Sequence, residues 1–99
     1  MYIWVVRLGF DEFFTQLTMS CKSDGTFSAL LRMEKIEEFI RILESKYRVA
    51  AKVKTLLIRF DVNGVPLTFM YPNRVVFKLG PGKDKKDARE FLEKIVSAR

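Results

Sequence analysis

An Asn-Gly pair at positions 63 and 64, between two alternating apolar runs, constrains the fold of this chain more than any other feature. A type I′ turn needs positive φ at both central residues, and this pair supplies them. The two-residue turn pairs Val62 with Val65 and so sets the register of a hairpin with one apolar and one half-polar side. The expected pairs on the apolar side are Phe60 with Leu67, Ile58 with Phe69 and Leu56 with Tyr71.

A third strand follows this hairpin. If Pro72 and Asn73 alone formed the connecting turn, the apolar residues of the third strand would lie on the half-polar side. We therefore predict that Arg74 is a bulge in the loop. The predicted neighbours are then Val75, Phe77 and Leu79 beside Tyr71, Phe69 and Leu67, in that order.

The other segments show two periodicities. Residues 2–8, 13–22 and 26–32 alternate, which is typical of strands, although residues 10–17 can also begin as a helical turn. Residues 33–47 and those after Asp84 carry apolar stripes at helical spacing. Asp84, with Asp87 three residues on, is expected to cap the second helix after a Gly-Pro-Gly linker.

These elements predict a single α+β domain over residues 1–99, in the order βββαβββα. Two amphipathic helices would cover one face of an antiparallel sheet. The halves 1–48 and 49–99 also resemble each other, since Val5–Leu8 matches Leu57–Phe60 and Leu17–Met19 matches Leu67–Met70. Internal duplication is one interpretation, and chance similarity between short apolar strands is the other.

Catalysis finds little support in the composition. The chain has no histidine, and its single cysteine, Cys21, alternates with apolar neighbours as a small core residue would. We expect no metal site and no cofactor, and we predict that the protein is not an enzyme. The Gly-Pro-Gly-Lys segment that ends at Lys83 lacks the spacing of a nucleotide-binding phosphate loop.

Net charge is the main functional clue. The chain carries +6 over 99 residues, which favours polyanionic partners. It has no apolar run near the roughly 20 residues of a membrane span, and its first residues lack the basic region of a signal peptide. We therefore expect a cytoplasmic protein without membrane contact. The absence of histidine and the scarcity of amide side chains hint at a thermophilic source.

Basic residues gather in three places. One is a run from Lys46 to Arg59 without an acid, the second is the sheet face turned away from the helices, and the third is the start of the last helix. Phosphates would meet the cations, and one aromatic residue at the end of the sheet face would support a base. The candidate nucleic-acid-binding residues are Arg7, Phe14, Lys22, Arg32, Arg48, Lys52, Lys54, Arg59, Lys78, Lys83, Lys85 and Lys86.

The same sheet face supports a second interpretation. Apolar residues, among them Leu57, Met70 and Val76, alternate there with polar ones. Such a mixed face is typical of a symmetric homodimer interface. A nucleic-acid-binding domain, single- or double-stranded in its preference, is our first hypothesis, and a homodimeric interaction or scaffold module is the alternative.

Residues 56–95 also resemble one repeat of the TATA-box-binding protein family. The matching pieces are Ile58-Arg59-Phe60, Leu67-Thr68-Phe69, Arg74-Val75-Val76, Gly80, Asp87-Ala88-Arg89 and Lys94-Ile95-Val96. The resemblance implies an open sheet backed by helices. That family wedges phenylalanines from its sheet into the minor groove. The half-polar side of the predicted hairpin and third strand carries no phenylalanine. By element order alone, the chain is equally similar to Whirly-type single-stranded nucleic-acid binders.

Overall fold

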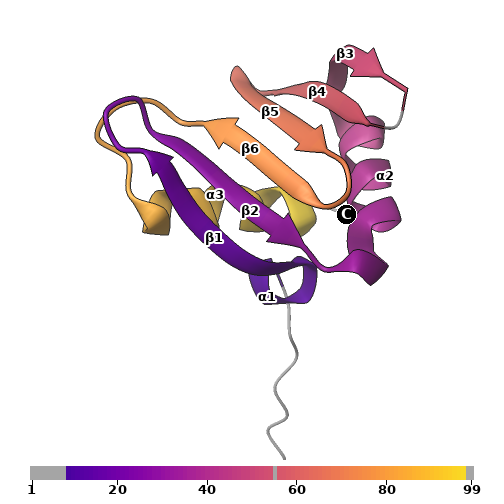
Figure 1. Ribbon diagram of the computed structural model, residues 1–99, viewed down its shortest axis with the longest axis horizontal. Helices are drawn as coiled ribbons and strands as arrows, with labels where there is room; N and C mark the ends of the chain where they lie inside the picture. The colour runs from indigo at the N-terminus through magenta and orange to yellow at the C-terminus, as the bar shows by residue number, and fades with distance from the viewer. Residues whose placement is uncertain (1–8, 55, 98–99) are drawn as a thin grey trace, which may run out of the picture.

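The computed structural model describes residues 9–54 and 56–97, which form one sheet and its covering helices (Figure 1). The α-helices are α1 (Phe10–Phe13), α2 (Ile36–Lys46) and α3 (Lys85–Ser97), and a 3-10 helix, η1 (Met33–Lys35), precedes α2. The strands are β1 (Phe14–Cys21), β2 (Thr26–Leu31), β3 (Arg48–Val53), β4 (Leu57–Val62), β5 (Val65–Met70) and β6 (Arg74–Lys78).

The six strands form one antiparallel sheet in the order β1-β2-β6-β5-β4-β3. Helix α2 carries the chain from β2 to β3 at the far edge of the sheet (Figure 1). The four strands that follow then return step by step until β6 pairs with β2. The α+β class and the antiparallel sheet with amphipathic helices are therefore confirmed.

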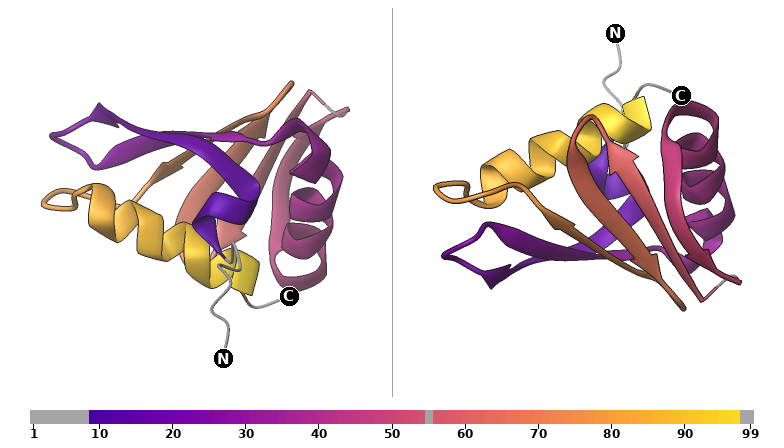
Figure 2. Two further views of the ribbon diagram at one scale, coloured as in Figure 1. Left: turned by 90° about the horizontal axis from the view of Figure 1, so that it is seen from below. Right: turned by 90° about the horizontal axis from the view of Figure 1, so that it is seen from above.

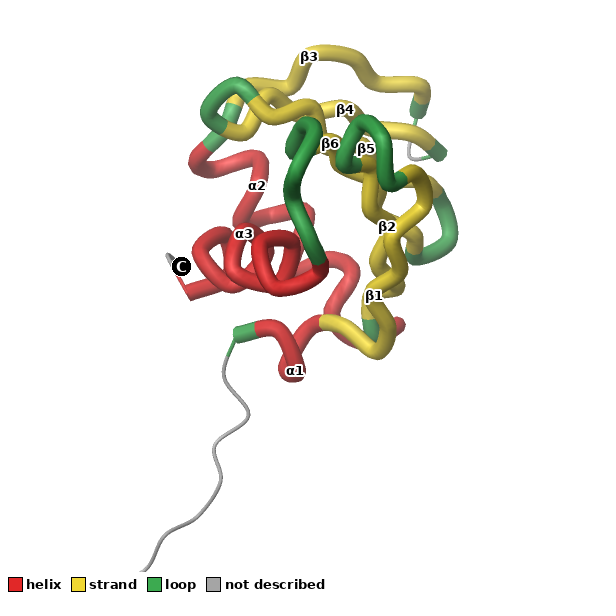
Figure 3. The backbone as a smooth tube through the Cα atoms, turned by 90° about the vertical axis from the view of Figure 1, so that its left-hand side faces the viewer, coloured by secondary structure: helices red, strands yellow, loops and turns green. Residues whose placement is uncertain are grey.

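Both long helices lie on the same side of the sheet. The sheet curves around them, so its other side is convex and uncovered within the described residues (Figures 2 and 3). We call this convex side the outer face. The concave side holds the hydrophobic core, where apolar residues of alternate strand positions meet the stripes of α2 and α3, including Phe39, Leu43 and Leu92.

The Asn-Gly hairpin has the predicted register. Val62 pairs with Val65, Phe60 with Leu67 and Ile58 with Phe69. Asn63 and Gly64 have φ values of 53° and 90°, as a type I′ turn requires. The Asp61 carboxylate also accepts the Gly64 N–H at 2.8 Å.

The last predicted pair of this hairpin is formed but not buried. The Tyr71 N–H donates to the Leu56 carbonyl at 2.8 Å, yet these residues are 64% and 53% exposed. The pair lies beyond Ile58 and Phe69, which are the last core residues at this end of the hairpin.

The β5–β6 connection differs from the prediction. Arg74 is not a loop bulge, because it belongs to β6 and pairs with Met70. The loop is Tyr71-Pro72-Asn73, with a cis peptide bond before the proline. Asn73 holds this loop against β2: its carbonyl accepts the Leu31 N–H at 2.8 Å, and its amide donates to the Leu31 carbonyl at 2.9 Å. The predicted and observed loops both contain three residues, so Val75 and Phe77 keep their predicted side. Their predicted partners are wrong, because Val75 pairs with Phe69 instead of Tyr71 and Phe77 pairs with Leu67 instead of Phe69.

The predicted element order is only roughly correct. Residues 10–13 form the helix α1, which agrees with the helical-turn alternative. Residues 48–53 form β3, which we had not predicted as a strand. All six of its residues are exposed at the sheet edge, so its sequence carries no burial pattern. The strand expected at residues 2–8 lies outside the described residues, and duplication of the two halves stays a prediction.

Candidate nucleic-acid interface

The strand pairing arranges the outer face into three rows of side chains, because directly paired residues point to the same side of a sheet. The first row contains Arg48, Asp61, Pro66, Lys78, Thr26 and Cys21. The middle row contains Ala51, Arg59, Thr68, Val76, Ser28 and Thr18. The third row contains Val53, Leu57, Met70, Arg74, Leu30 and Gln16. Because Cys21 lies in the first row, its prediction as a core residue is wrong: the pairing of β1 with β2 shifts between Met19 and Cys21, which turns Cys21 to the outer side.

Three cations surround the centre of this face. Arg59 lies on β4, two strands away from Arg74 and Lys78 on β6. With a strand spacing of about 4.8 Å and a rise of about 3.3 Å per residue, Arg59 is roughly 12 Å from each of them, measured between Cα atoms. The two β6 cations are about 13 Å apart on the same basis. Arg48 adds a fourth cation at the β3 edge, so the face presents a widely spaced set of positive charges.

Two hydroxyl groups orient the guanidinium groups on the sheet. The Arg59 Nε lies 3.5 Å from the Thr68 Oγ1, and the Arg74 Nη1 lies 3.3 Å from the Ser28 Oγ. Hydrogen bonds to neutral hydroxyls leave the positive charge of each arginine uncompensated. Both side chains therefore retain donors for an anion that approaches from solvent.

A shallow hollow of about 200 Å³ lies between Arg59 and Lys78. It is lined by Thr26, Arg59, Pro66, Thr68, Val76, Phe77 and Lys78. The β1–β2 turn adjoins it. There the Thr26 hydroxyl donates to the Asp24 carboxylate at 2.7 Å, and this hydrogen bond lowers the pKa of Asp24. Asp24 is thus an anion at neutral pH, and it repels an anionic ligand at this end of the hollow.

The acids of the protein are placed unevenly. All twelve lie within the described residues, and ten of them belong to α1, η1, α2, α3 or the residue that caps α3. The two others are Asp61 in the first row and Asp24 in the β1–β2 turn. On the outer face, Asp61 is the strand partner of Arg48, and Lys78 is close enough to Asp24 to help lower the pKa of that carboxyl. Acidic charge on this face is therefore confined to the first row and its end, and none lies in the rows of Arg59 and Arg74.

Ion pairs follow the same division. Within the described part of the chain, the salt bridges join Lys35 to Glu12 and Glu38, and Arg89 to Asp11 and Glu93. None of the four outer-face cations takes part in one. The Lys35 contacts, first with Glu12 and then with Glu38, raise the pKa of Lys35. Lys35 and Arg89 are thus paired on the helical side, whereas the outer-face cations are available to a ligand.

Arg59 and Lys78 lie on the outer face as predicted, and Arg48 joins them at the edge. Arg74 is the outer-face residue that our sequence prediction missed, because we placed it in the loop. The available signal was the alternation of Arg74, Val76 and Lys78 with the apolar Val75 and Phe77, which is typical of a strand that begins at Arg74. Arg7 lies outside the described residues.

The prediction for Phe14 is wrong. Its side chain is 1% exposed and packs in the core against Phe10 and Phe39. The pairing between β1 and β2 shifts between Phe14 and Gln16, so Thr15 is an extra residue there. Because such a bulge reverses the alternation on one side of it, Gln16 and Thr18 keep their predicted side and Phe14 does not.

Four other predicted cations lie away from the rows. The Arg32 Nε donates to the Asp11 carbonyl at 2.9 Å, which holds this side chain beside α1. Lys52 pairs with Ile58 and so belongs to the helical side of β3, although it is exposed. Lys54 follows β3 with a φ of 53°. Lys22 is exposed in the β1–β2 turn.

The predicted phosphate site at the start of α3 is occupied by acids. Asp84 Oδ1 accepts the Asp87 N–H at 3.1 Å, and Asp87 Oδ2 accepts the Asp84 N–H at 3.0 Å. This reciprocal cap confirms the expected role of Asp84, and the Asp87 backbone hydrogen bond lowers the pKa of Asp84. Two carboxylates at the helix entrance oppose a phosphate there, so we place Lys83, Lys85 and Lys86 outside the interface.

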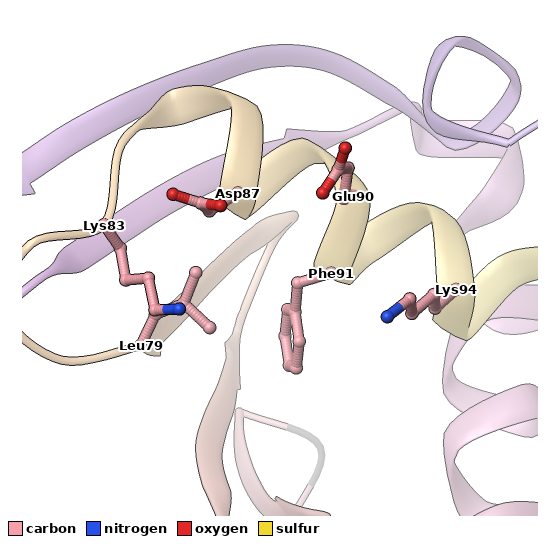
Figure 4. Close-up of a pocket in the computed structure, with 6 residues that line it drawn as sticks. All are labelled: Leu79, Lys83, Asp87, Glu90, Phe91 and Lys94. Carbon is pink, nitrogen blue, oxygen red and sulfur yellow. The ribbon is translucent and has the colours of Figure 1, made fainter.

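A second hollow, of about 240 Å³, lies between α3 and the segment before it (Figure 4). Leu79 and Phe91 form its apolar part, and its rim carries Lys83 and Lys94 together with Asp87 and Glu90. Its charges are balanced. Neither a polyanion nor a polycation is favoured by this hollow.

Comparison with protein-family models, curated proteins and solved structures found no match to this chain. The resemblances to the TATA-box-binding protein repeat and to Whirly-type proteins therefore stay predictions. No helix in the described ranges has the length and apolarity needed to cross a bilayer. Residues 9–54 and 56–97 also contain no group of acids and cysteine placed to hold a metal ion.

Proposed function

We propose that this protein binds nucleic acid through its outer face, with phosphate contacts from Arg59, Arg74 and Lys78. The observation that carries the proposal is the separation of charge. Ten of the twelve acids belong to helical segments, and the cations of the outer face have no carboxylate in ion-pair contact within the described residues. Unpaired arginines and lysines on a surface beside hydroxyl groups suit phosphate and sugar recognition.

A salt titration with matched variants tests this function. Binding of a labelled oligonucleotide of about 20 nucleotides is measured by fluorescence anisotropy between about 50 and 200 mM salt. The affinity should fall steeply with salt, because each neutralised phosphate releases counterions. The test variant is Arg59→Gln with Lys78→Gln. The control variant is Lys85→Gln with Lys86→Gln, which removes the same charge from α3.

The outer-face variant should lower the magnitude of the log–log slope by about 1.4 to 1.8, which corresponds to two lost phosphate contacts. The control should keep most of the wild-type slope. Equal losses in the two variants would mean that net charge alone attracts the ligand. Absence of binding by the wild type at about 50 mM salt would refute the function itself.

A homodimer through the third row is our second candidate. Leu57, Met70 and Leu30 give this row an apolar character, and exposed Leu56 and Tyr71 lie at the same end of the sheet. An apolar surface of this kind suits self-association. Sedimentation of the wild type and of Leu57→Glu tests it, since a dimer should become a monomer in the variant. A wild type that sediments as a monomer at high concentration would exclude this candidate.

A further inference from the structure

Within residues 9–54 and 56–97, the outer face lacks the aromatic side chains that a single-stranded ligand needs. Proteins that hold single strands on a sheet stack the bases on exposed aromatic rings. None of the residues in the three rows is aromatic. The phenylalanines of the inner strands, Phe27, Phe60, Phe69 and Phe77, are at most 1% exposed and lie in the core.

Among the described residues, one aromatic residue is exposed. Tyr71 is 64% exposed in the β5–β6 loop. It follows Met70 of the third row, and its N–H continues the β4–β5 pairing to the Leu56 carbonyl, so alternation continued by one residue beyond β5 places it on the opposite side of the sheet from the outer face. Tyr71 can therefore not serve as a platform for bases that lie across the rows, and it offers a useful control.

What the face does offer are donors for the sugar–phosphate backbone. Arg59, Arg74 and Lys78 surround the centre of the face. Hydroxyl groups of Thr18, Thr26 and Thr68 lie in the rows among them. Hydrogen bonds from such groups go mainly to phosphates and sugars, which position a protein on a duplex without reading bases.

The spacing of the cations points to two phosphate chains. Arg59 on β4 and the two cations on β6 lie about 9.6 Å apart across the sheet and roughly 12 Å apart along the diagonal, and both values are comparable to the width of about 12 Å of the B-DNA major groove. Between them β5 presents only Pro66, Thr68 and Met70. The sheet is convex on this side (Figure 3), so with β5 facing the groove the cations on β4 and β6 would reach its opposite walls.

We infer that the partner is double-stranded DNA, held in its major groove by backbone contacts, and not a single strand. This inference rests on the proposed function and adds the class of nucleic acid to it. A duplex also carries about one charge per 1.7 Å of axis, twice the density of one strand. Double-stranded RNA has a narrow and deep major groove that side chains do not enter, so it should fit the convex face poorly.

The experiment is a direct comparison of three ligands of one sequence, namely duplex DNA, single-stranded DNA and duplex RNA. Anisotropy titrations at about 100 mM salt should show duplex DNA bound at least about tenfold more tightly than either of the others. Equal or tighter binding of the single strand or of the RNA duplex overturns the inference and leaves the proposed function in place. No binding of any ligand overturns both.

Two variants extend the comparison. Arg74→Gln should reduce the slope for duplex DNA by about 0.9, because one phosphate contact is lost. Tyr71→Ala should leave the affinity for duplex DNA within about twofold of the wild type. A tenfold loss with Tyr71→Ala would show that a base stacks on this ring and would overturn the inference, provided that the circular dichroism spectrum and Tm of the variant match those of the wild type.

Discussion

Replacement of Phe14 by alanine should destabilise the protein severely, although its place in the alternating sequence marks it as exposed. The ring is 1% exposed. It stacks on Phe10 at 5.2 Å between ring centroids and meets Phe39 edge-on at 5.3 Å. Burial of such a side chain contributes about 1.5–3 kcal/mol, and each aromatic pair contributes roughly 0.5–1.5 kcal/mol more. With the cavity that alanine leaves, we expect a loss of about 3–5 kcal/mol in the free energy of unfolding.

Urea denaturation followed by circular dichroism measures this loss. For a domain of this size the midpoint should fall by roughly 2–3 M urea, with an unchanged m value. Since small domains have only about 5–15 kcal/mol in total, Phe14→Ala can be largely unfolded. Phe14→Leu is the milder variant, with an expected loss of about 1–2 kcal/mol.

Gln16→Ala is the matched control two residues along the same strand. Gln16 is exposed in the third row, so its replacement should change the stability by less than about 0.5 kcal/mol. If Phe14→Ala and Gln16→Ala have the same small effect, the bulge at Thr15 is absent. Phe14 would then lie on the outer face, which would present an aromatic ring on which a base can stack.

Two further predictions concern the turns and caps. Gly25→Ala should lower the free energy of unfolding by about 2–5 kcal/mol, because φ is +69° and a Cβ would lie 1.9 Å from the Gly80 carbonyl oxygen. Gly64 has a φ of +90° and no atom within 4 Å of an added Cβ. Gly64→Ala should therefore lower the free energy of unfolding by only about 1–2 kcal/mol in the same urea assay. Equal losses for the two variants would mean that the β1–β2 turn at Gly25 does not contact the segment at Gly80. Asp84→Ala should lower the Tm by roughly 4–8 °C at pH 7, whereas Asp84→Asn should keep most of the cap. Hydrogen bonding lowers the pKa of Asp84 in the folded protein. The contribution of Asp84 to stability is therefore present above the unfolded pKa of about 3.9 and is lost as the pH falls through the folded pKa. A Tm difference between wild type and Asp84→Ala that persists unchanged at pH 2 would contradict this.

The central hairpin could be predicted because its register depends on two adjacent residues. Asn63 and Gly64 adopt positive φ at little cost, and the pairing of Val62 with Val65 then fixes every later pair. The cap at Asp84 is also local, since its partner is three residues away. Arg59 could be placed on the outer face for the same reason, because it is only four residues from the turn.

The errors concern contacts that are distant in the sequence. The β5–β6 loop is held by Asn73 against Leu31, 42 residues away, and this contact decides that Arg74 belongs to a strand. The bulge at Thr15 lets consecutive phenylalanines, Phe13 and Phe14, both enter the core, where Phe39 contacts both. Periodicity within a single segment indicates neither the Asn73–Leu31 contact nor the bulge at Thr15. The residues of the candidate site could therefore be predicted only in part.

The two candidate functions make opposite predictions about salt, and the outer face itself supplies the reason. A symmetric dimer through the third row would bring Arg74 of one copy toward the cationic face of the other, and the third row contains no acid. Like charges across such an interface are destabilising, so added salt should strengthen the dimer by screening them. A nucleic acid meets the same cations with opposite charge, and added salt must weaken its binding. The sign of the salt effect therefore decides between the candidates before any ligand preference is known.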